Sequence, residues 1–244
     1  MLNFLLALQF LTVLPTKIKR VDAAALAKSL VFFPLAGVFL GVSLAAFNYF
    51  FGLCGIPERS ADIIIVVMLA VLTGGMHLDG LADTCDALFS RKNREEMLRI
   101  MRDSHSGAMG VIAIACALLL KISLLWALSP QQKAPALILA CALSRWSMVM
   151  AIFVFPYARQ EGKALPYFSG INRKIFFTAS AIAVASIYLA GGGNSIFIAL
   201  SAAALTALLG RGISRKLGGI TGDSLGAINE INEIFALFLF LCLR

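Results

Sequence analysis

Charge is what this chain has least of. Asp, Glu, Lys and Arg make up 14% of its 244 residues, whereas 60% of the residues are hydrophobic and the mean hydropathy is +0.89. A soluble domain usually carries about 25% charged residues. The scarcity of charge therefore excludes a soluble protein and predicts an integral membrane protein, in which each helix crosses the bilayer with about 20 apolar residues.

Paired cysteines, a cleavable leader and internal repeats are also missing. The five cysteines are scattered and none forms a CxxC pair, which argues against a zinc site and against a disulfide framework. The N-terminal stretch MLNFLLALQFLTVLP has neither a basic region nor a small-residue cleavage site, so we do not interpret it as a signal peptide. It is short for a span and ends at Pro15, which favours an interfacial or re-entrant segment.

Apolar segments fill the rest of the chain. Their lengths predict spans at about 30–53, 61–78, 106–128, 134–156, 175–191 and 195–213, and a seventh at about 225–243. The seventh begins among acidic residues, so we expect its first turns to face protein or water. The fold class expected is an all-α polytopic membrane protein of about six to seven transmembrane helices, forming a single domain over residues 1–244.

Basic residues are distributed very unevenly between the two sides of these spans. Sixteen of the 21 Lys and Arg lie in four segments on one side, 17–28, 91–102, 159–174 and 211–216. Only Arg59, Lys133 and Arg244 lie on the other side. Loops rich in Lys and Arg stay in the cytoplasm, so we expect these segments and the active site to face the cytoplasm. The membrane expected is the bacterial cytoplasmic (inner) membrane. The net charge of +8 largely reflects this bias, so no nucleic-acid partner is indicated; the partner expected is the lipid bilayer.

The stretch HLDGLADTCD, residues 77–86, places three carboxylates at the end of an apolar segment. Asp79, Asp83 and Asp86 are spaced i, i+4, i+7, which puts them on one stripe of a helix. Three unpaired carboxylates on one stripe repel one another, and a divalent cation removes that conflict. Hard oxygen ligands suit Mg²⁺, which typically takes one or two carboxylates plus phosphate oxygens. The alternative is a solvated acidic helix end.

Two glycine-containing turns follow. In MRDSHSGAMG, residues 101–110, Asp103 or Ser104 is expected to cap the next helix. Gly107 and Gly110 would allow close helix packing or a phosphate at the helix N-terminus. In GGITGDSLGAINEINE, residues 218–233, a glycine-rich turn leads into an acidic helix. It could hold phosphate, metal or a second substrate, or be a plain loop and cap.

Two cations and a histidine lie inside or near apolar segments. Arg145 lies within a span, where it must pair with an acid, a carbonyl or a ligand. A structural ion pair and a phosphate clamp remain equally open for it. Lys121 is expected to extend toward the membrane surface or to pack along its apolar stem. His77 precedes Asp79 by two residues and should point away from the acidic stripe.

These residues predict a polytopic membrane enzyme with a cytoplasmic, metal-dependent site that acts on a phosphate ester or anhydride. The phosphatidyltransferases that use CDP-alcohols are one alternative, although the aspartate spacing here is tighter and no later paired-aspartate motif follows. A cation-coupled transporter is another, but its acids would lie near mid-span rather than at span ends. A non-catalytic scaffold would leave the acidic stripe unexplained.

The motifs along the chain closely resemble those of the cobalamin synthase family. The resemblance is carried by TGGMHLDGLADTCDALFSRKNREEMLRIMRDSHSGAMG at 73–110, LTVLP at 11–15, FFPLAG at 32–37, SR at 144–145, YARQEG at 157–162 and GGITGDSLGAINEINE at 218–233. These motifs occur in the family's order and cover nearly the whole chain. HLDGLADTCD is the most specific of them.

The resemblance implies a late step of cobalamin biosynthesis. The substrates implied are adenosylcobinamide-GDP and α-ribazole or its 5′-phosphate, the products adenosylcobalamin or its phosphate and GMP, and the cofactor Mg²⁺. The resemblance also allows other cobalamin-assembly enzymes as partners and allows the chain to form an oligomer. The roles implied are Mg²⁺ binding by Asp79, Asp83 and Asp86 with help from Asp103, a base at one of these acids, Asp223 or Glu230, and substrate or phosphate binding by Arg145, Arg159, Gly107, Gly110 and Gly222.

Overall fold

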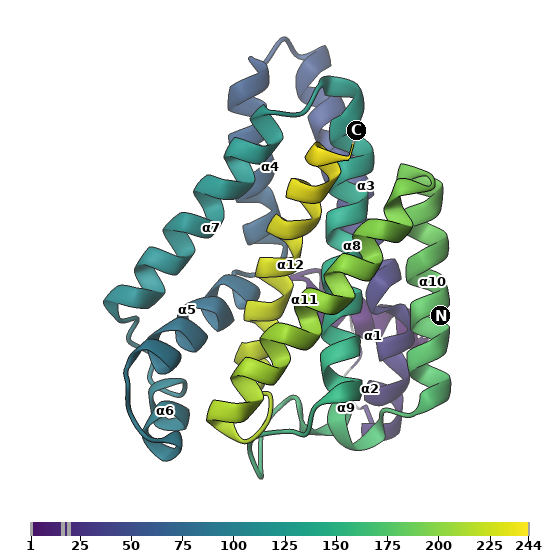
Figure 1. Cartoon of the computed structure of the whole chain (residues 1–244). Helices are drawn as coiled ribbons and strands as arrows, with labels where there is room; N and C mark the ends of the chain where they lie inside the picture. Colours follow the sequence, from purple (N-terminus) through teal and green to yellow (C-terminus); the bar gives the residue numbers. More distant parts are fainter. Residues whose placement is uncertain (1, 16–17, 19–20, 244) are drawn as a thin grey trace.

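The computed structural model describes residues 2–15, 18 and 21–243, which form a bundle of α-helices (Figure 1). Lys17, Lys19, Arg20 and Arg244, which contribute to the charge count above, lie outside the described residues. The chain order is α1 (Leu2–Leu11), α2 (Ala23–Ser29), a short 3-10 turn (Leu30–Phe32), α3 (Phe33–Leu53), α4 (Glu58–Leu72), α5 (Met76–Phe89), α6 (Arg94–Ile100), α7 (Ala108–Trp126), α8 (Pro130–Val154), α9 (Leu165–Gly170), α10 (Arg173–Gly191), α11 (Asn194–Leu217) and α12 (Gly222–Cys242).

Within the described residues, six segments are long and apolar enough to cross a membrane. They are α7, α8, α10, α11, α12 and the continuous run Ala23–Leu53 that ends with α3; the bent pair of α4 and α5 would make a seventh. The prediction of an all-α polytopic membrane protein with six to seven spans is therefore confirmed. Large apolar side chains on the outer surface fit this, since Leu189 is 85% exposed and Leu208 69% exposed, as expected of residues that face lipid.

The second predicted span, 61–78, has the wrong C-terminal boundary. Helix α4 ends at Leu72, and the chain turns by 84° before α5 begins at Met76. Gly74 and Gly75 have φ angles of 62° and 67° in this turn. Positive φ is incompatible with a continuing right-handed helix and is readily adopted only by glycine. The turn directs α5 away from the bundle axis (Figure 1).

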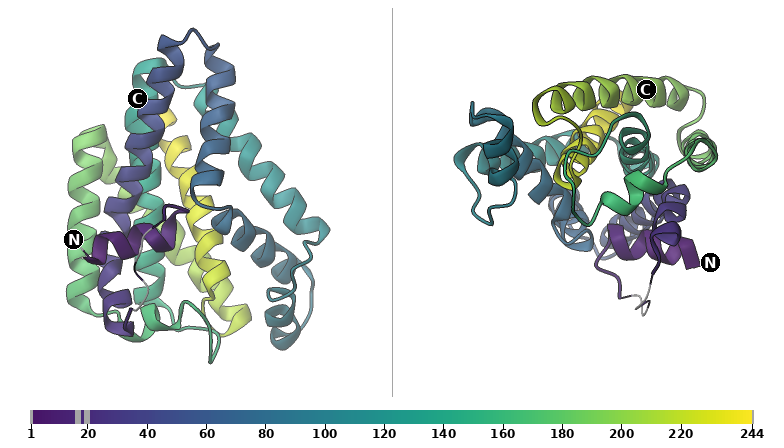
Figure 2. Two further views of the ribbon diagram at one scale, coloured as in Figure 1. Left: turned by 180° about the vertical axis from the view of Figure 1, so that it is seen from behind. Right: turned by 90° about the horizontal axis from the view of Figure 1, so that it is seen from below.

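Helix α8 lies at the centre of the bundle and packs against α3, α10, α11 and α12. Its contact with α3 is very close, because a Cβ atom at Gly37 would lie 2.2 Å from the carbonyl oxygen of Cys141. Within a membrane no hydrophobic effect drives helices together, and small residues allow two helices to approach closely. Helix α1 has only ten residues and lies across the bundle (Figure 2), as expected of a segment too short to span.

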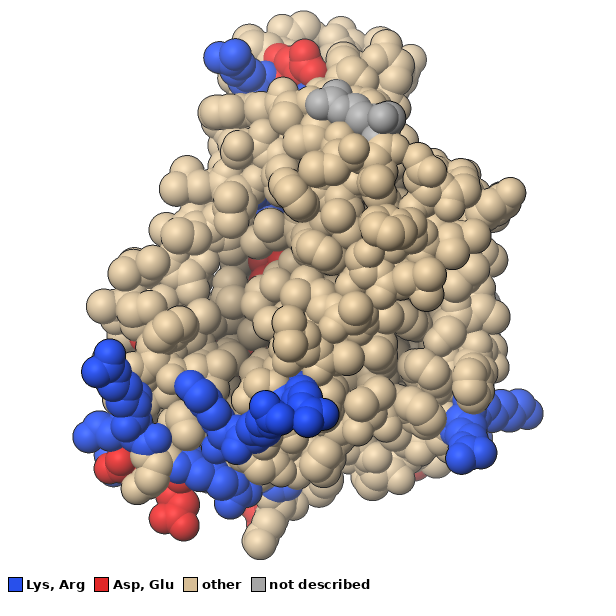
Figure 3. Space-filling view, viewed as in Figure 1, with Lys and Arg blue, Asp and Glu red and all other residues tan. Residues whose placement is uncertain are grey.

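Lys and Arg gather at one end of the bundle (Figure 3). This end carries α6, α9 and the connection between α11 and α12 (Figure 1) and is called the basic end below. It also carries α5 and the connection between α8 and α9. Every polar loop in which the sequence predicts site residues therefore lies at the same end of the molecule.

Candidate active site

The acidic stripe exists as the sequence predicts. Asp79, Asp83 and Asp86 lie on the continuous helix α5, and the first and last are about 10 Å apart along its axis at 1.5 Å per residue. The Asp83 carboxyl group interacts electrostatically with both other aspartates and also with Asp223 from α12. The carboxylates of α5 and the carboxylate of Asp223 are therefore near enough to one another to interact.

Asp86 has a structural partner that the sequence did not predict. Its two carboxylate oxygens accept hydrogen bonds from the backbone N–H groups of Gly107, at 2.7 Å, and Gly110, at 2.8 Å. These donors belong to the first turn of α7, so Asp86 caps α7 from a neighbouring helix and favours it through the helix dipole. The prediction that Asp103 or Ser104 caps α7 is wrong, because the N-cap residue is Gly107.

The same contact explains the two glycines. A Cβ atom at Gly107 would lie 2.5 Å from an oxygen of Asp86, and one at Gly110 would lie 2.4 Å from the other oxygen. Only glycine lets this carboxylate approach the helix end so closely. The N–H groups that we expected to bind phosphate therefore bind the Asp86 carboxylate instead.

Asp103 lies apart from the acidic stripe. Its carboxylate accepts hydrogen bonds from the ring nitrogen of His105, at 2.7 Å, and from the backbone N–H of the same residue, at 3.0 Å. These two bonds, the ring contact first, hold the pKa of Asp103 below its usual range. Both side chains are exposed. The structure thus places Asp103 in a solvated turn and gives it no described contact with α5.

Two connections at the basic end, one after α8 and one after α11, are joined by backbone hydrogen bonds of the kind found between β-strands. Ala158 donates to the carbonyl of Ile220 at 2.9 Å, and Ile220 donates to the carbonyl of Pro156 at 2.8 Å. A Cβ atom at Gly219 would lie 2.5 Å from the Pro156 carbonyl oxygen, so this contact requires glycine. The pairing brings the YARQEG and GGITGDS motifs side by side.

This pairing positions a cation over an acid. Arg159 donates from Nη2 to Oδ2 of Asp223 at 2.9 Å. Asp223 lies in the first turn of α12, where Thr221 caps the helix by accepting from the Ser224 N–H. A carboxylate in the first turn interacts favourably with the helix dipole. Asp223 is therefore fixed at the helix start by both its backbone and its side chain.

Helices α5 and α12 cross at two glycines. A Cβ atom at Gly80 would lie 2.5 Å from the carbonyl oxygen of Asp223, and one at Gly226 would lie 3.1 Å from the carbonyl oxygen of His77. The absence of these side chains lets the two backbones nearly touch. As a result Asp79 of α5 and Asp223 of α12 line one cavity.

A cavity of about 280 Å³ opens at this crossing. It is lined by Phe10, Met76, Asp79, Tyr157, Arg159, Gly162, Lys163, Ala164, Gly222 and Asp223. Two acids and two cations face one space, which we call the acidic cavity. Burial raises the pKa of the Tyr157 phenol, an effect that nearby Arg159 partly offsets, so this phenol is uncharged at neutral pH and can donate a hydrogen bond.

The acidic cavity suits a metal only with help from a substrate. Within the described part of the chain, no three Asp, Glu, His or Cys side chains are gathered closely enough to hold a metal ion by themselves. The aspartates of α5 are spread along the helix, and the oxygens of Asp86 are bonded to α7. Mg²⁺ commonly takes one or two carboxylates and completes its shell with water and phosphate oxygens. Asp79 and Asp223, which line the cavity, supply such hard oxygen donors, and Asp83 lies one turn beyond Asp79 on α5.

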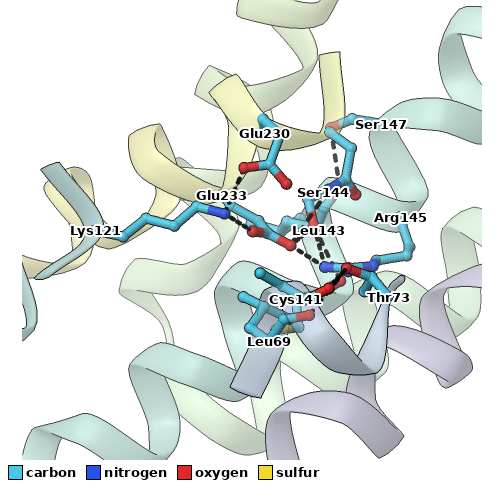
Figure 4. Close-up of polar contacts among 12 residues, drawn as sticks. Leu69, Thr73, Lys121, Cys141, Leu143, Ser144, Arg145, Ser147, Glu230 and Glu233 are labelled. Atoms are coloured by element: carbon cyan, nitrogen blue, oxygen red, sulfur yellow. Dashed lines mark hydrogen bonds and ion pairs between the residues drawn. The ribbon is translucent and has the colours of Figure 1, made fainter. Parts of the chain in front are cut away.

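Deeper in the bundle lies a second polar group that connects α7, α8 and α12 (Figure 4). Lys121 donates to Glu230 at 2.6 Å and also to Glu233, which in turn accepts from Arg145. All four side chains are at most 5% exposed. Two cations and two anions balance, which lowers the cost of placing charge inside a membrane protein.

This buried ion cluster settles where three expected residues lie. Arg145 is fully buried and forms an ion pair with Glu233 and a hydrogen bond to Ser144. Phosphate binding by Arg145 stays a prediction. Glu230, one of the candidate bases, is paired with Lys121 and does not line the acidic cavity. Lys121 is packed in the bundle interior and does not extend toward the membrane surface, because its ammonium points inward to two acids (Figure 4).

Some of the residues that line the site were not predicted from the sequence. Tyr157 and Lys163 line the acidic cavity, yet neither was singled out. The signal in the sequence was the YARQEG motif, which contains Tyr157 and is followed directly by Lys163. The pairing of Lys121 also had a signal, since Glu230 and Glu233 are one turn apart on an apolar helix and require a cation.

Comparison with known proteins adds the family. The model of the family described as cobalamin-5-phosphate synthase matches residues 3–241. Adenosylcobinamide-GDP ribazoletransferases from Desulforamulus reducens and Geotalea daltonii are 39% and 38% identical, covering 97% and 96% of this chain and 94% of each relative. The one from Roseiflexus sp. is 40% identical over 95% of this chain and 86% of its own length. No solved structure matches. The chain therefore belongs to the cobalamin-5-phosphate synthase family.

Proposed function

We propose that this protein joins adenosylcobinamide-GDP to α-ribazole or α-ribazole 5′-phosphate, releasing GMP and forming adenosylcobalamin or its 5′-phosphate. Family membership over residues 3–241 and the names of the relatives support this activity. The structural observation that carries the proposal is the acidic cavity, where Asp79 and Asp223 meet Arg159 and Lys163. Carboxylates beside cations in one cleft are the groups that phosphoryl transfer requires.

The reaction is a displacement at phosphorus. A ribazole hydroxyl oxygen forms a bond to the phosphorus next to cobinamide, the bond from this phosphorus to the bridging oxygen breaks, and GMP leaves with that oxygen. The hydroxyl proton passes to a carboxylate of the cavity. Asp223 is placed for this role, because Arg159 and the start of α12 fix its position. Arg159 and Lys163 stabilise the charge that develops on the departing phosphate.

The proposed cofactor is Mg²⁺, which Asp79 and Asp83 would hold. Bound there, the ion would supply neutralisation of the pyrophosphate charge. Asp86 acts differently in this scheme, because its hydrogen bonds to Gly107 and Gly110 hold α7 against α5. The stripe thus combines metal-binding carboxylates with one that maintains the helix arrangement.

The test is a turnover assay on membranes that contain the protein. With Mg²⁺, adenosylcobinamide-GDP labelled at the cobinamide-side phosphorus, and α-ribazole, GMP should appear in equal amount with a complete cobalamin that retains the label. EDTA should abolish the reaction. Asp79→Asn should lower the rate at least about ten-fold, since a barrier increase of 1.4 kcal/mol is one decade. Label in the released nucleotide, or turnover that is unaffected by EDTA, would refute the mechanism.

A further inference from the structure

A second cavity, of about 390 Å³, lies beside the acidic cavity at the basic end. It is lined by Arg94, Leu98, Arg102, Ala158, Arg159, Gln160 and Glu161, and we call it the arginine cavity. Arg159 lines both cavities. Three guanidinium groups face a single carboxylate here, so the arginine cavity is positive, whereas the acidic cavity contains two acids and two cations.

One of the arginines that line the arginine cavity also holds its walls together by hydrogen bonds. Arg94, at the first turn of α6, donates from Nε to the Leu217 carbonyl at 2.7 Å and from Nη2 to the Ala158 carbonyl at 3.1 Å. It therefore joins α6 to the end of α11 and to the connection after α8. A cavity held by such long-range hydrogen bonds is a built feature of the fold rather than a chance gathering of surface side chains.

The cavity has hydrogen-bond donors that no described residue uses. The Arg102 side chain is exposed and has no hydrogen bond or ion pair with any described residue. The Arg159 side chain is 13% exposed, and within the described residues it donates a hydrogen bond only from Nη2. Guanidinium groups bind phosphate through paired hydrogen bonds, so the unused donors point to a phosphate.

We propose that the arginine cavity binds the 5′-phosphate of α-ribazole 5′-phosphate, an inference that rests on the proposed function. The two phosphorus atoms of the pyrophosphate share one oxygen, so both remain in the acidic cavity with the metal-binding carboxylates. The 5′-phosphate of the second substrate is separated from the attacking hydroxyl by a sugar ring. It therefore needs a neighbouring cationic site, and Arg159 forms the wall between the two.

Arg102→Gln tests this assignment, because Arg102 is exposed and has no described partner whose loss would disturb folding. In membranes, KM for α-ribazole 5′-phosphate should rise about ten-fold or more, since one lost charge-assisted contact to phosphate has roughly that effect. KM for α-ribazole, which lacks the phosphate, should stay within about two-fold. Arg102→Lys, which keeps the charge but loses the planar fork, should recover part of the affinity.

The matched control is Arg99→Gln, which removes the same charge three residues earlier, in the last turn of α6, at a position outside the cavity lining. It should leave both KM values unchanged. An equal effect of Arg102→Gln on both substrates, or an equal effect of Arg99→Gln, would overturn the proposal. In parallel, calorimetry measures the affinity of the purified wild-type and variant proteins for α-ribazole 5′-phosphate. If the wild-type protein turned over neither substrate, the proposed function would fail, and this binding comparison would still decide the role of the cavity.

Discussion

At the scale of single residues, the charged side chains serve two different purposes. Those at the basic end line cavities, as Asp79 and Arg159 do. Those in the bundle interior are paired, as Lys121 is with Glu230 and Glu233. Charges inside a membrane protein are tolerated when they are neutralised and hydrogen-bonded. The buried ion cluster therefore joins α7, α8 and α12 in the bundle interior.

The buried ion cluster predicts a compensating pair of substitutions. Lys121→Met should destabilise the protein strongly, by about 3–5 kcal/mol, because breaking a buried ion pair leaves an uncompensated charge. Lys121→Met combined with Glu230→Gln restores neutrality and should be closer to the wild type. Thermal unfolding of the purified protein in detergent measures both variants. A double variant less stable than Lys121→Met alone would contradict the neutralising role.

At the scale of helices, the site depends on how closely α5 approaches α12. Neither helix contains the site by itself, since Asp79 and Asp83 come from α5 and Asp223 comes from α12. The backbones nearly touch at Gly80. The turn at Gly74 and Gly75 contributes as well, because it bends α5 by 84° relative to α4 and so sets the direction in which α5 crosses α12.

Gly80→Ala should therefore lower activity without preventing membrane insertion. The added methyl group would lie 2.5 Å from the Asp223 carbonyl oxygen, so the helices must separate. We expect kcat/KM to fall about ten-fold or more, since small displacements of catalytic groups have large effects on rate. Gly212→Ala in α11 is the matched control, because its methyl group would meet nothing within 4 Å. Equal activities of the two variants would rule out a role for the close crossing.

At the scale of the whole molecule, the spans place all the candidate chemistry at the basic end. Figure 3 shows Lys and Arg gathered there, below a surface that is almost entirely uncharged. We propose that the basic end faces the cytoplasm and that the membrane is the bacterial inner membrane, because positively charged loops are retained on the cytoplasmic side. Soluble substrates would then reach both cavities directly.

Reporter fusions test this orientation. Fusions at Lys92, Lys163 and Lys216 should report the cytoplasm, and fusions at Arg59 and Lys133 should report the opposite side. The physical reason is the charge bias, since translocating basic loops across the membrane is unfavourable. A fusion at Lys92 that reports the outer side would invert the topology and separate the cavities from cytoplasmic substrates.

The sequence by itself determined the fold class, the approximate spans and the helical stripe of Asp79, Asp83 and Asp86. These follow from local quantities, namely apolar run length and the helical period. The pairing of Lys121, the capping of α7 by Asp86 and the meeting of Arg159 with Asp223 were decided only by the tertiary structure. Each of these contacts joins residues more than 20 positions apart, so it depends on which helix faces which. That arrangement is set by close approaches at glycines and by turns of positive φ, whose direction in space a one-dimensional pattern does not contain.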